Sequence, residues 1–206
     1  MKKKIILIGG GGHAQSCIEI INQNKEFKLI GFFDKNKNIK KIFEFNNLYL
    51  KNKDINFFKN KINFLILGIG FIKNSKQREK IYQELVNNKF KFENLISKNS
   101  TLSKFAKIGK ANQIFNNVIV NAGSVIEDNV ILNNNCLIDH NCNVGQNTHI
   151  STGAILNGDV VIGDNTFIGS GVIINQGIKV VRIGHDKMKP MSERKGFIDL
   201  TRKIRP

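Results

Sequence analysis

The chain of 206 residues lacks tryptophan and contains only two prolines, two tyrosines and three cysteines. Cys17, Cys136 and Cys142 show no CxxC spacing and are too few for a disulfide framework, so we expect reduced thiols, no metal site and a cytoplasmic location. The longest apolar runs, such as Ile5 to Ile8, are too short to span a membrane, so we expect no membrane insertion. Because glycines interrupt that run at once, the lysine-rich start also does not fit a secretory signal.

Acidic residues are scarce: 16 Asp and Glu stand against 32 Lys and Arg, and the formal net charge is +16. The excess lies in residues 1–100 and 179–206, whereas residues 101–178 are slightly negative. Lysines scattered among asparagine and phenylalanine are typical of solvated faces, so we expect no nucleic-acid partner. Nucleic-acid binding through the basic tail remains an alternative; it predicts salt-dependent binding that is lost when residues 179–206 are deleted.

A six-residue period dominates the second half of the chain. Every sixth residue from residue 102 to residue 180 is aliphatic: Leu102, Ile108, Ile114, Val120, Ile126, Leu132, Ile138, Val144, Ile150, Leu156, Ile162, Ile168, Ile174 and Val180. A second series, four residues after each, is mostly small and includes Cys136 and Cys142. Fixed-period self-similarity predicts a solenoid, here with three hexads per triangular coil of short parallel strands. An antiparallel sandwich would instead need alternation with a period of two.

Two histidines, His140 and His149, interrupt this small and aliphatic segment. Both lie outside the two inward-facing series, so we expect both rings to project outward from the coils. Cys136 and Cys142 belong to the small series and are interpreted as core residues.

The first hundred residues predict a small parallel α/β domain, because apolar runs alternate with helical patterns. We expect strands over Ile5–Ile8, Lys28–Phe33 and Asn63–Leu67, a helix after His13, and a second helix over Lys76–Asn88. The domain boundaries that we expect are 1–98 for the α/β domain, 99–180 for the β-helix and 181–206 for a basic tail or cap.

Residues 9–14, GGGGHA, satisfy the pattern GxGxxA, and Asp34 follows about twenty residues later at the end of a strand. Such a loop lets backbone N–H groups approach phosphates at a helix N-terminus. We interpret it as a nucleotide or nucleotide-sugar phosphate site. NAD fits less well, because a domain of about 95 residues is roughly half of the doubled unit that holds a dinucleotide. A purely structural turn remains the alternative.

The glycine loop with its histidine, the hexads, and the IDH and TH sequences that end at His140 and His149 together resemble the PglD/NeuD family of sugar acyltransferases. The resemblance covers residues 3–178. It implies a left-handed β-helix and an acetyl-CoA-dependent enzyme that modifies bacterial cell-surface sugars. It also implies a homotrimer with the active site between the β-helices of adjacent subunits, and an α/β domain that holds a nucleotide sugar.

The resemblance also implies roles for individual residues. His140 corresponds to the catalytic base, with Asp139 beside it, and His149 to a histidine near the acetyl-CoA thioester. The residues expected to contact the nucleotide sugar are Gly9, Gly11, Gly12, His13, Asp34, Gly68 and Gly70. Because the oxyanion formed during transfer needs a hydrogen-bond donor, the backbone N–H of Gly158 is a candidate.

We therefore expect transfer of an acetyl group to the amino group of a nucleotide-linked deoxyaminosugar in surface glycan synthesis. O-acetylation of a sialic-acid-like sugar is the alternative within the same class. A trimeric scaffold that binds a sugar nucleotide without catalysis is the alternative from another class. The hexads stop at Val180 where the family continues for one or two coils, so the tail departs from the family pattern.

Overall fold

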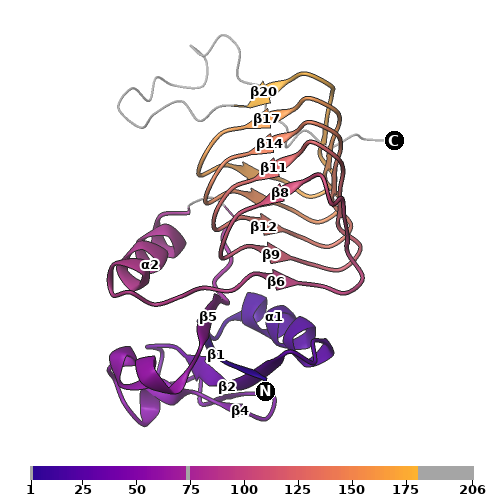
Figure 1. Cartoon of the computed structure of the whole chain (residues 1–206). Coiled ribbons are helices and arrows are strands. Elements are labelled where there is room, and N and C mark those ends of the chain that lie inside the picture. Colours follow the sequence, from indigo (N-terminus) through magenta and orange to yellow (C-terminus); the bar gives the residue numbers. More distant parts are fainter. Residues whose placement is uncertain (1, 73–74, 181–206) are drawn as a thin grey trace, which may run out of the picture.

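The computed structural model describes residues 2–72 and 75–180, which form a small α/β domain followed by a β-helix (Figure 1). The tail or cap expected over residues 181–206 lies outside the described residues. The α/β domain lies at the end of the β-helix where the first coil begins, and the second long helix runs beside the coils. The predicted fold class is confirmed: a small parallel sheet with helices precedes a left-handed parallel β-helix of hexapeptide type.

A three-stranded parallel sheet forms the centre of the α/β domain, with strand order β2-β1-β5. Its strands are β1 (Lys3–Ile8), β2 (Phe27–Phe33) and β5 (Phe64–Leu67). β1 is buried on both faces: Ile5 and Leu7 pack toward helix α1, whereas Ile6 and Ile8 pack toward helix α2. A strand covered on both faces needs a continuous apolar run, and that explains why no polar alternation marks this segment.

Two helices and four short elements complete the domain. The helices are α1 (Gly12–Gln23) and α2 (Lys76–Asn87). The short elements, which the sequence analysis did not predict, are β3 (Lys41–Ile42), β4 (Phe45–Asn46) and the 3-10 helices η1 (Leu48–Leu50) and η2 (Ile55–Lys61). The predicted strands and helices agree with the observed ones to within two residues at each end.

The β-helix consists of three five-stranded parallel sheets, one on each side of the triangular coil. The first sheet, called the docked face, contains β6 (Leu95–Ile96), β9 (Gln113–Ile114), β12 (Ile131–Leu132), β15 (His149–Ile150) and β18 (Phe167–Ile168). The second, called the apolar face, contains β7 (Thr101–Leu102), β10 (Ile119–Val120), β13 (Leu137–Ile138), β16 (Ile155–Leu156) and β19 (Ile173–Ile174). The third, called the mixed face, contains β8 (Lys107–Ile108), β11 (Val125–Ile126), β14 (Asn143–Val144), β17 (Val161–Ile162) and β20 (Lys179–Val180).

The predicted register is confirmed, because each strand pairs with the strand one coil later, as in Ile131 with His149. The coils start at Leu95–Ile96, one hexad before Leu102. The aliphatic and small series fill the interior, where Cys136 and Cys142 are buried as expected.

Left-handed backbone conformations mark nearly every turn between strands. The third turn residue has a positive φ at Ala111, Asn117, Gly123, Asn129, Asn135, Asn141, Asn147, Gly153, Asp159, Asn165, Gly171 and Gly177. Asparagine, aspartate and glycine tolerate this region best, and this explains why the repeat is rich in them.

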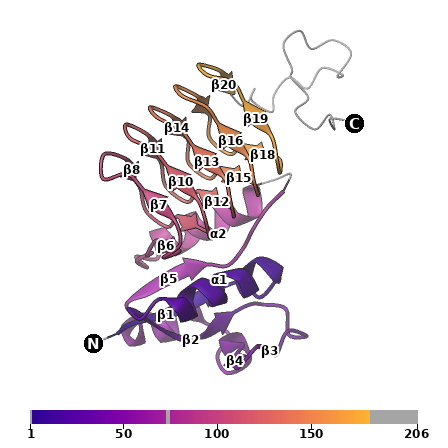
Figure 2. The ribbon, with the colours of Figure 1, turned by 90° about the vertical axis from the view of Figure 1, so that its right-hand side faces the viewer.

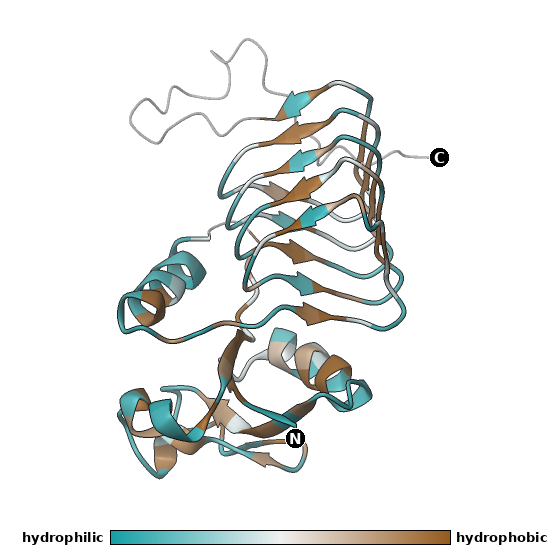
Figure 3. Ribbon diagram, viewed as in Figure 1, coloured by the Kyte–Doolittle hydropathy of each residue, from teal (hydrophilic) through white to brown (hydrophobic). Residues whose placement is uncertain are grey.

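The outward residues differ from face to face. On the apolar face they are Thr101, Ile119, Leu137, Ile155 and Ile173, and Figure 2 shows this face uncovered by any other described element. On the mixed face lysine or asparagine alternates with valine along the stack, which Figure 3 shows as alternating colours. On the docked face the outward residues are buried or partly buried, because the α/β domain and the start of α2 pack against them. No helix among residues 2–72 and 75–180 is long and apolar enough to cross a bilayer.

Candidate active site

The glycine loop lies at the carboxyl edge of the parallel sheet, where β1, β2 and β5 all end. Gly9 has φ +103°, a conformation that favours glycine, and its N–H donates to the Phe33 carbonyl at 3.0 Å. The Gly10 N–H donates to Asp34 Oδ2 at 2.7 Å, while Asp34 Oδ1 accepts from the Asn36 N–H. Both carboxylate oxygens of Asp34 therefore accept hydrogen bonds from backbone N–H groups, and one of these bonds connects the glycine loop to the end of β2.

Gly11 and Gly12 differ from their neighbours, because a Cβ added to either would meet nothing within 4 Å. Gly11 is the N-cap of α1 and offers no side-chain cap. The first N–H groups of a helix have no partner inside it, so this exposed end can receive an anion. Open space above two adjacent glycines leaves room for a phosphate to approach the backbone.

Gly68 and Gly70 are required by packing within the chain. A Cβ on Gly68 would lie 2.9 Å from Leu7 Cγ, and a Cβ on Gly70 would lie 3.1 Å from His13 Cγ. The loop after β5 thus packs directly against the glycine loop and its histidine. The structure therefore brings together all seven residues predicted to contact the nucleotide sugar.

His13 joins the glycine loop to the docked face. Its Nε2 lies 3.1 Å from Gln113 Oε1, and its ring packs at 5.3 Å between centroids against Phe115. Because an amide oxygen only accepts, Nε2 carries the proton. Burial, with the nearby positive charge of Arg78, lowers the pKa of His13 to about 4. The ring is thus neutral at physiological pH and holds the two domains together.

His149 lies on the same interface. It projects outward from its coil, as predicted, but the α/β domain covers it. Its Nδ1 donates to the Phe71 carbonyl at 2.7 Å, and its Nε2 lies 3.4 Å from Asn133 Nδ2. Its ring packs edge-on against Phe71 and Phe167, and burial lowers its pKa. Its expected contact with acetyl-CoA stays a prediction.

His140 lies at the corner between the apolar and mixed faces, in the turn from β13 to β14, and its side chain is exposed. We call this corner the His140 corner. The equivalent residues one coil earlier and one coil later are Ala122 and Gly158. A Cβ on Gly158 would overlap Cε1 and Nε2 of the imidazole, so the ring lies directly against that glycine. Ala122 and Gly158 carry little or no side chain on either side of the ring, and we call the position between them the notch.

Asp139 precedes His140 in the same turn. Its Oδ1 accepts from Asn121 Nδ2 at 2.9 Å and from the His140 backbone N–H at 2.8 Å. These bonds lower the pKa of Asp139, so its carboxylate is ionised near neutrality. Within the described residues this carboxylate supports the turn, and it makes no hydrogen bond to the imidazole ring.

The predicted site residues thus form two groups on opposite sides of the β-helix. The first contains the glycine loop, Asp34, Gly68, Gly70 and His149, next to the docked face. The second contains His140, Asp139 and Gly158. In a triangular coil, the corner between two faces lies opposite the third face. One chain therefore does not bring its own glycine loop to its own His140.

Two buried polar residues in the α/β domain were missed by the sequence analysis. Asn47 is 1% exposed. Its Oδ1 accepts from the Asp34 N–H at 3.1 Å and its Nδ2 donates to the carbonyls of Asp34 and Ile39, at 2.8 and 2.9 Å. It thereby orders the segment after β2. No spacing rule marks this residue, because its partners are defined only by the folded loop.

Arg78 is the second, and it is 1% exposed. Its Nη1 donates to the carbonyls of Leu67 and Ile69, behind the loop that packs on His13, while Nε and Nη2 have no partner. Burial lowers the pKa of this guanidinium to about 9. The helical pattern of α2 marked this position only as polar.

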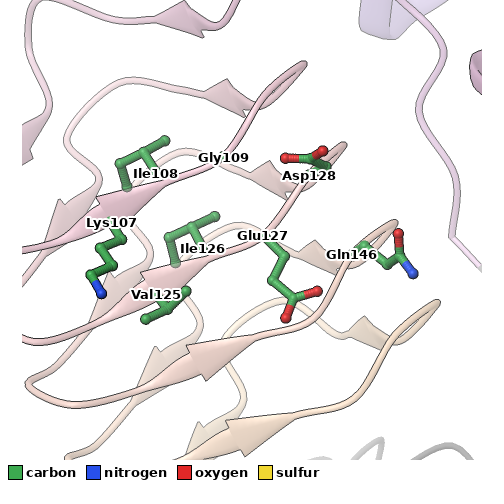
Figure 4. A pocket seen from close by; sticks show the side chains of 8 residues that line it. All are labelled: Lys107, Ile108, Gly109, Val125, Ile126, Glu127, Asp128 and Gln146. Carbon is green, nitrogen blue, oxygen red and sulfur yellow. The ribbon is translucent and has the colours of Figure 1, made fainter. Parts of the chain in front are cut away.

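A shallow hollow lies on the mixed face, away from both groups. It is lined by Lys107, Ile108, Gly109, Val125, Ile126, Glu127, Asp128 and Gln146, as Figure 4 shows. Over residues 2–72 and 75–180, no group of three or more His, Cys, Asp or Glu side chains is placed to hold a metal ion.

The lowered pKa of His13 predicts a pH-dependent stability. Below pH 6.5 the unfolded chain binds a proton on this ring, whereas the folded chain binds it only near pH 4. Acid therefore favours unfolding across this window, by up to about 3 kcal/mol from this group. The free energy of unfolding in urea, measured from pH 7 to pH 4.5, reports this effect. The comparison is with His13→Asn, whose side chain keeps a hydrogen-bond donor near Gln113 but does not titrate. We expect the stability advantage of the wild type over this variant to shrink as the pH falls; a constant difference would contradict the assignment.

Two protein-family models match the chain. The model described as PglD N-terminal domain matches residues 4–85, and the model described as bacterial transferase hexapeptide (six repeats) matches residues 141–176. A search of curated protein sequences found no significant match.

Solved structures extend this similarity over most of the chain. The acetyltransferase domain of PglB from Neisseria gonorrhoeae FA1090 is 28% identical with a TM-score of 0.77, and the match covers 87% of this chain and 86% of that one. The same domain has been solved in complex with acetyl coenzyme A. PerB from Caulobacter crescentus, solved with CoA and GDP-perosamine, is 22% identical with a TM-score of 0.69. The match covers 91% of this chain and 97% of PerB. WeeI from Acinetobacter baumannii AYE is 20% identical with a TM-score of 0.69, and the match covers 86% of this chain and 88% of WeeI. PerB and WeeI share the fold. Residues 4–85 thus match the PglD N-terminal domain, residues 141–176 match the bacterial transferase hexapeptide repeat, and the chain as a whole is similar to the gonococcal PglB acetyltransferase domain.

Proposed function

We propose that the protein transfers the acetyl group of acetyl-CoA to the amino group of a nucleotide-linked deoxyaminosugar in bacterial surface glycan synthesis. One observation carries the proposal: an exposed histidine, His140, lies against Gly158 at a β-helix corner. The similarity to the gonococcal PglB acetyltransferase domain, solved with acetyl coenzyme A, supports acetyl-CoA as the donor. Three buried free thiols fit the reducing cytoplasm that we propose as the location.

The chemistry needs a base and an oxyanion donor. The neutral sugar amine attacks the thioester carbonyl; a C–N bond forms, the C–S bond breaks, and CoA leaves as the thiolate. His140 takes the proton from the amine and returns it to the departing sulfur. Over the described residues the Gly158 N–H makes no hydrogen bond, so it is available to the oxyanion within reach of the same ring.

The glycine loop suits the phosphates of the nucleotide sugar. The uncapped start of α1 and the open space above Gly11 and Gly12 favour an anion. The GDP-perosamine bound to PerB is a ligand of this chemical class. The segment ordered by Asn47 follows β2 and lies beside the loop, where a base or ribose would continue from the phosphates.

A homotrimer completes the site in this proposal. The outward apolar ladder includes Ile119 and Ile173, which are 37% and 57% exposed, and Phe105 at the His140 corner is 67% exposed. Apolar surface of this kind favours burial against another copy. Because the glycine loop and His140 lie on opposite sides of one chain, a second copy would supply the missing half.

Thiol release from acetyl-CoA tests the activity. The protein is offered UDP- and GDP-linked 4-amino sugars and free sialic-type sugars. We expect release with a nucleotide-linked amino sugar and an acetamido product by mass spectrometry. Release only with a sialic-type hydroxyl acceptor would favour O-acetylation, and ligand binding without release would favour a scaffold.

Two inactive variants test whether the site is shared between chains. Gly11→Asp adds a favourable N-cap to α1 but places a negative charge where the phosphates would lie, so we expect normal folding and no nucleotide-sugar binding. His140→Ala removes the base. Co-expression of the two variants should restore activity in mixed oligomers, because one interface then pairs an intact loop with an intact His140. No restoration, despite mixed oligomers in native mass spectrometry, would place both groups in one chain.

A further inference from the structure

A histidine that accepts a proton at Nε2 must carry its other proton on Nδ1. In water the neutral side chain favours the opposite tautomer, with the proton on Nε2. A base of this kind therefore needs a group that accepts a hydrogen bond from Nδ1–H. His140 therefore needs a neighbouring residue that accepts a hydrogen bond from its Nδ1–H.

The geometry at the His140 corner leaves one candidate. The edge of the ring nearest Gly158 contains Cε1 and Nε2, whereas Nδ1 lies 3.4 Å from the carboxamide nitrogen of Asn141. Over the described residues, Asn141 is the only hydrogen-bond partner of this ring. Asp139 Oδ1 accepts from Asn121 Nδ2 and from the His140 backbone N–H, and within the described residues Asp139 makes no hydrogen bond to the ring.

Asn141 is held in place by the turn itself. It adopts φ +59°, a region that asparagine tolerates, and its N–H donates to the Ala122 carbonyl at 3.0 Å. Its side chain fills the space over Gly123, where a Cβ would overlap Asn141 Oδ1. Because Gly123 and Gly158 have no side chains, they leave space for the side chains of Asn141 and His140.

We propose that Asn141 is the positioning residue that sets the tautomer of His140. The structure places the carboxamide nitrogen next to Nδ1, and in that orientation the ring proton would be on Nε2. A half-turn of the carboxamide exchanges its oxygen and nitrogen with little change of shape, and Oδ1 then reaches Nδ1 from the same position. The oxygen then accepts Nδ1–H and leaves the Nε2 lone pair facing the notch. This inference rests on the proposed function of His140 as base.

A neutral amide orients the ring without adding charge. The acidic residues nearest in the fold are Asp139, in the same turn, and Asp159, in the next coil, whose backbone N–H donates to the His140 carbonyl. Asn141→Asp would keep an acceptor at Nδ1 and add a negative charge beside it. We expect this variant to keep the tautomer.

Nitrogen-15 NMR of the histidine rings tests the proposal directly. In the wild type we expect the His140 signal, assigned by its loss in His140→Ala, to show the Nδ1–H tautomer. In Asn141→Ala and Asn141→Gly it should change to the Nε2–H tautomer. The glycine variant removes the strain of a non-glycine residue at positive φ, and Asn117→Ala, at an equivalent turn position of another corner, is the control for that strain.

Kinetics supply the second readout. We expect kcat to fall at least about tenfold in Asn141→Ala and Asn141→Gly with little change in KM, and to be unchanged in Asn117→Ala. An Nε2–H tautomer in the wild type, or an unchanged tautomer in Asn141→Ala, would overturn the proposal. If the wild-type protein showed no acetyl transfer, the NMR measurement would still test the tautomer of His140 independently of the proposed function.

Discussion

His140→Ala is expected to lower kcat for acetyl transfer by about 10²–10⁴-fold while the protein stays folded. The reason is that, among residues 2–72 and 75–180, no other titratable ring lies at this corner to take the proton from the amine. The ring is exposed, and the backbone bond from the Asp159 N–H to the His140 carbonyl does not depend on the side chain. Initial rates of thiol release, with thermal unfolding as a check on folding, measure the effect.

His149→Phe tests the contact between the two domains. His149 lies between Phe71 and Phe167 in the domain contact, so an aromatic replacement keeps most of the packing and loses the bond to the Phe71 carbonyl. Within a single chain that change affects stability rather than the His140 corner. If His140→Ala retained near-normal kcat with the preferred acceptor, the base would have to be sought elsewhere.

Gly158→Ala is expected to lower kcat by about 10²-fold through the position of His140. The added methyl would overlap Cε1 and Nε2 of the imidazole, so the ring must rotate out of the notch. A displacement of about 1 Å in a catalytic group is enough for a loss of this size. Gly158 does not have a positive φ, so alanine is tolerated by its backbone. Steady-state kinetics and the His140 NMR signal report the displacement together.

Gly169→Ala is the matched control. It changes another glycine of the β-helix, where an added Cβ would find Val172 Cγ2 at an ordinary 3.7 Å. We expect wild-type kinetics from this variant. Equal activity in Gly158→Ala and Gly169→Ala would show that His140 does not depend on the space above it.

The β-helix could be predicted from the sequence because its information is local and repeated. Each hexad carries its own inward aliphatic residue and its own turn residue, and the same pattern returns every coil. The strands of the α/β domain were also predictable, since β1 needs apolar residues on both faces. The glycine loop and Asp34 were recognisable because they lie at the ends of predicted strands.

The contacts that position the site were not predictable in the same way. Asn47 acquires its partners only when the segment after β2 folds over it. Gln113 and His149 are polar residues at outward positions, and they are buried because the α/β domain packs on one face out of three. Nothing in the hexad pattern distinguishes that face from the other two.

The sequence by itself determined the two-part fold, the period of the coils, the glycine loop at the carboxyl edge of the sheet, and the outward direction of both His140 and His149. Only the tertiary structure decided that these two histidines lie in different environments, one buried and one exposed. His149 faces the α/β domain and loses its contact with water, whereas His140 lies half a coil away at the opposite corner and keeps it. The physical reason is that a hexad determines direction relative to its own coil, while burial depends on which face the preceding domain covers.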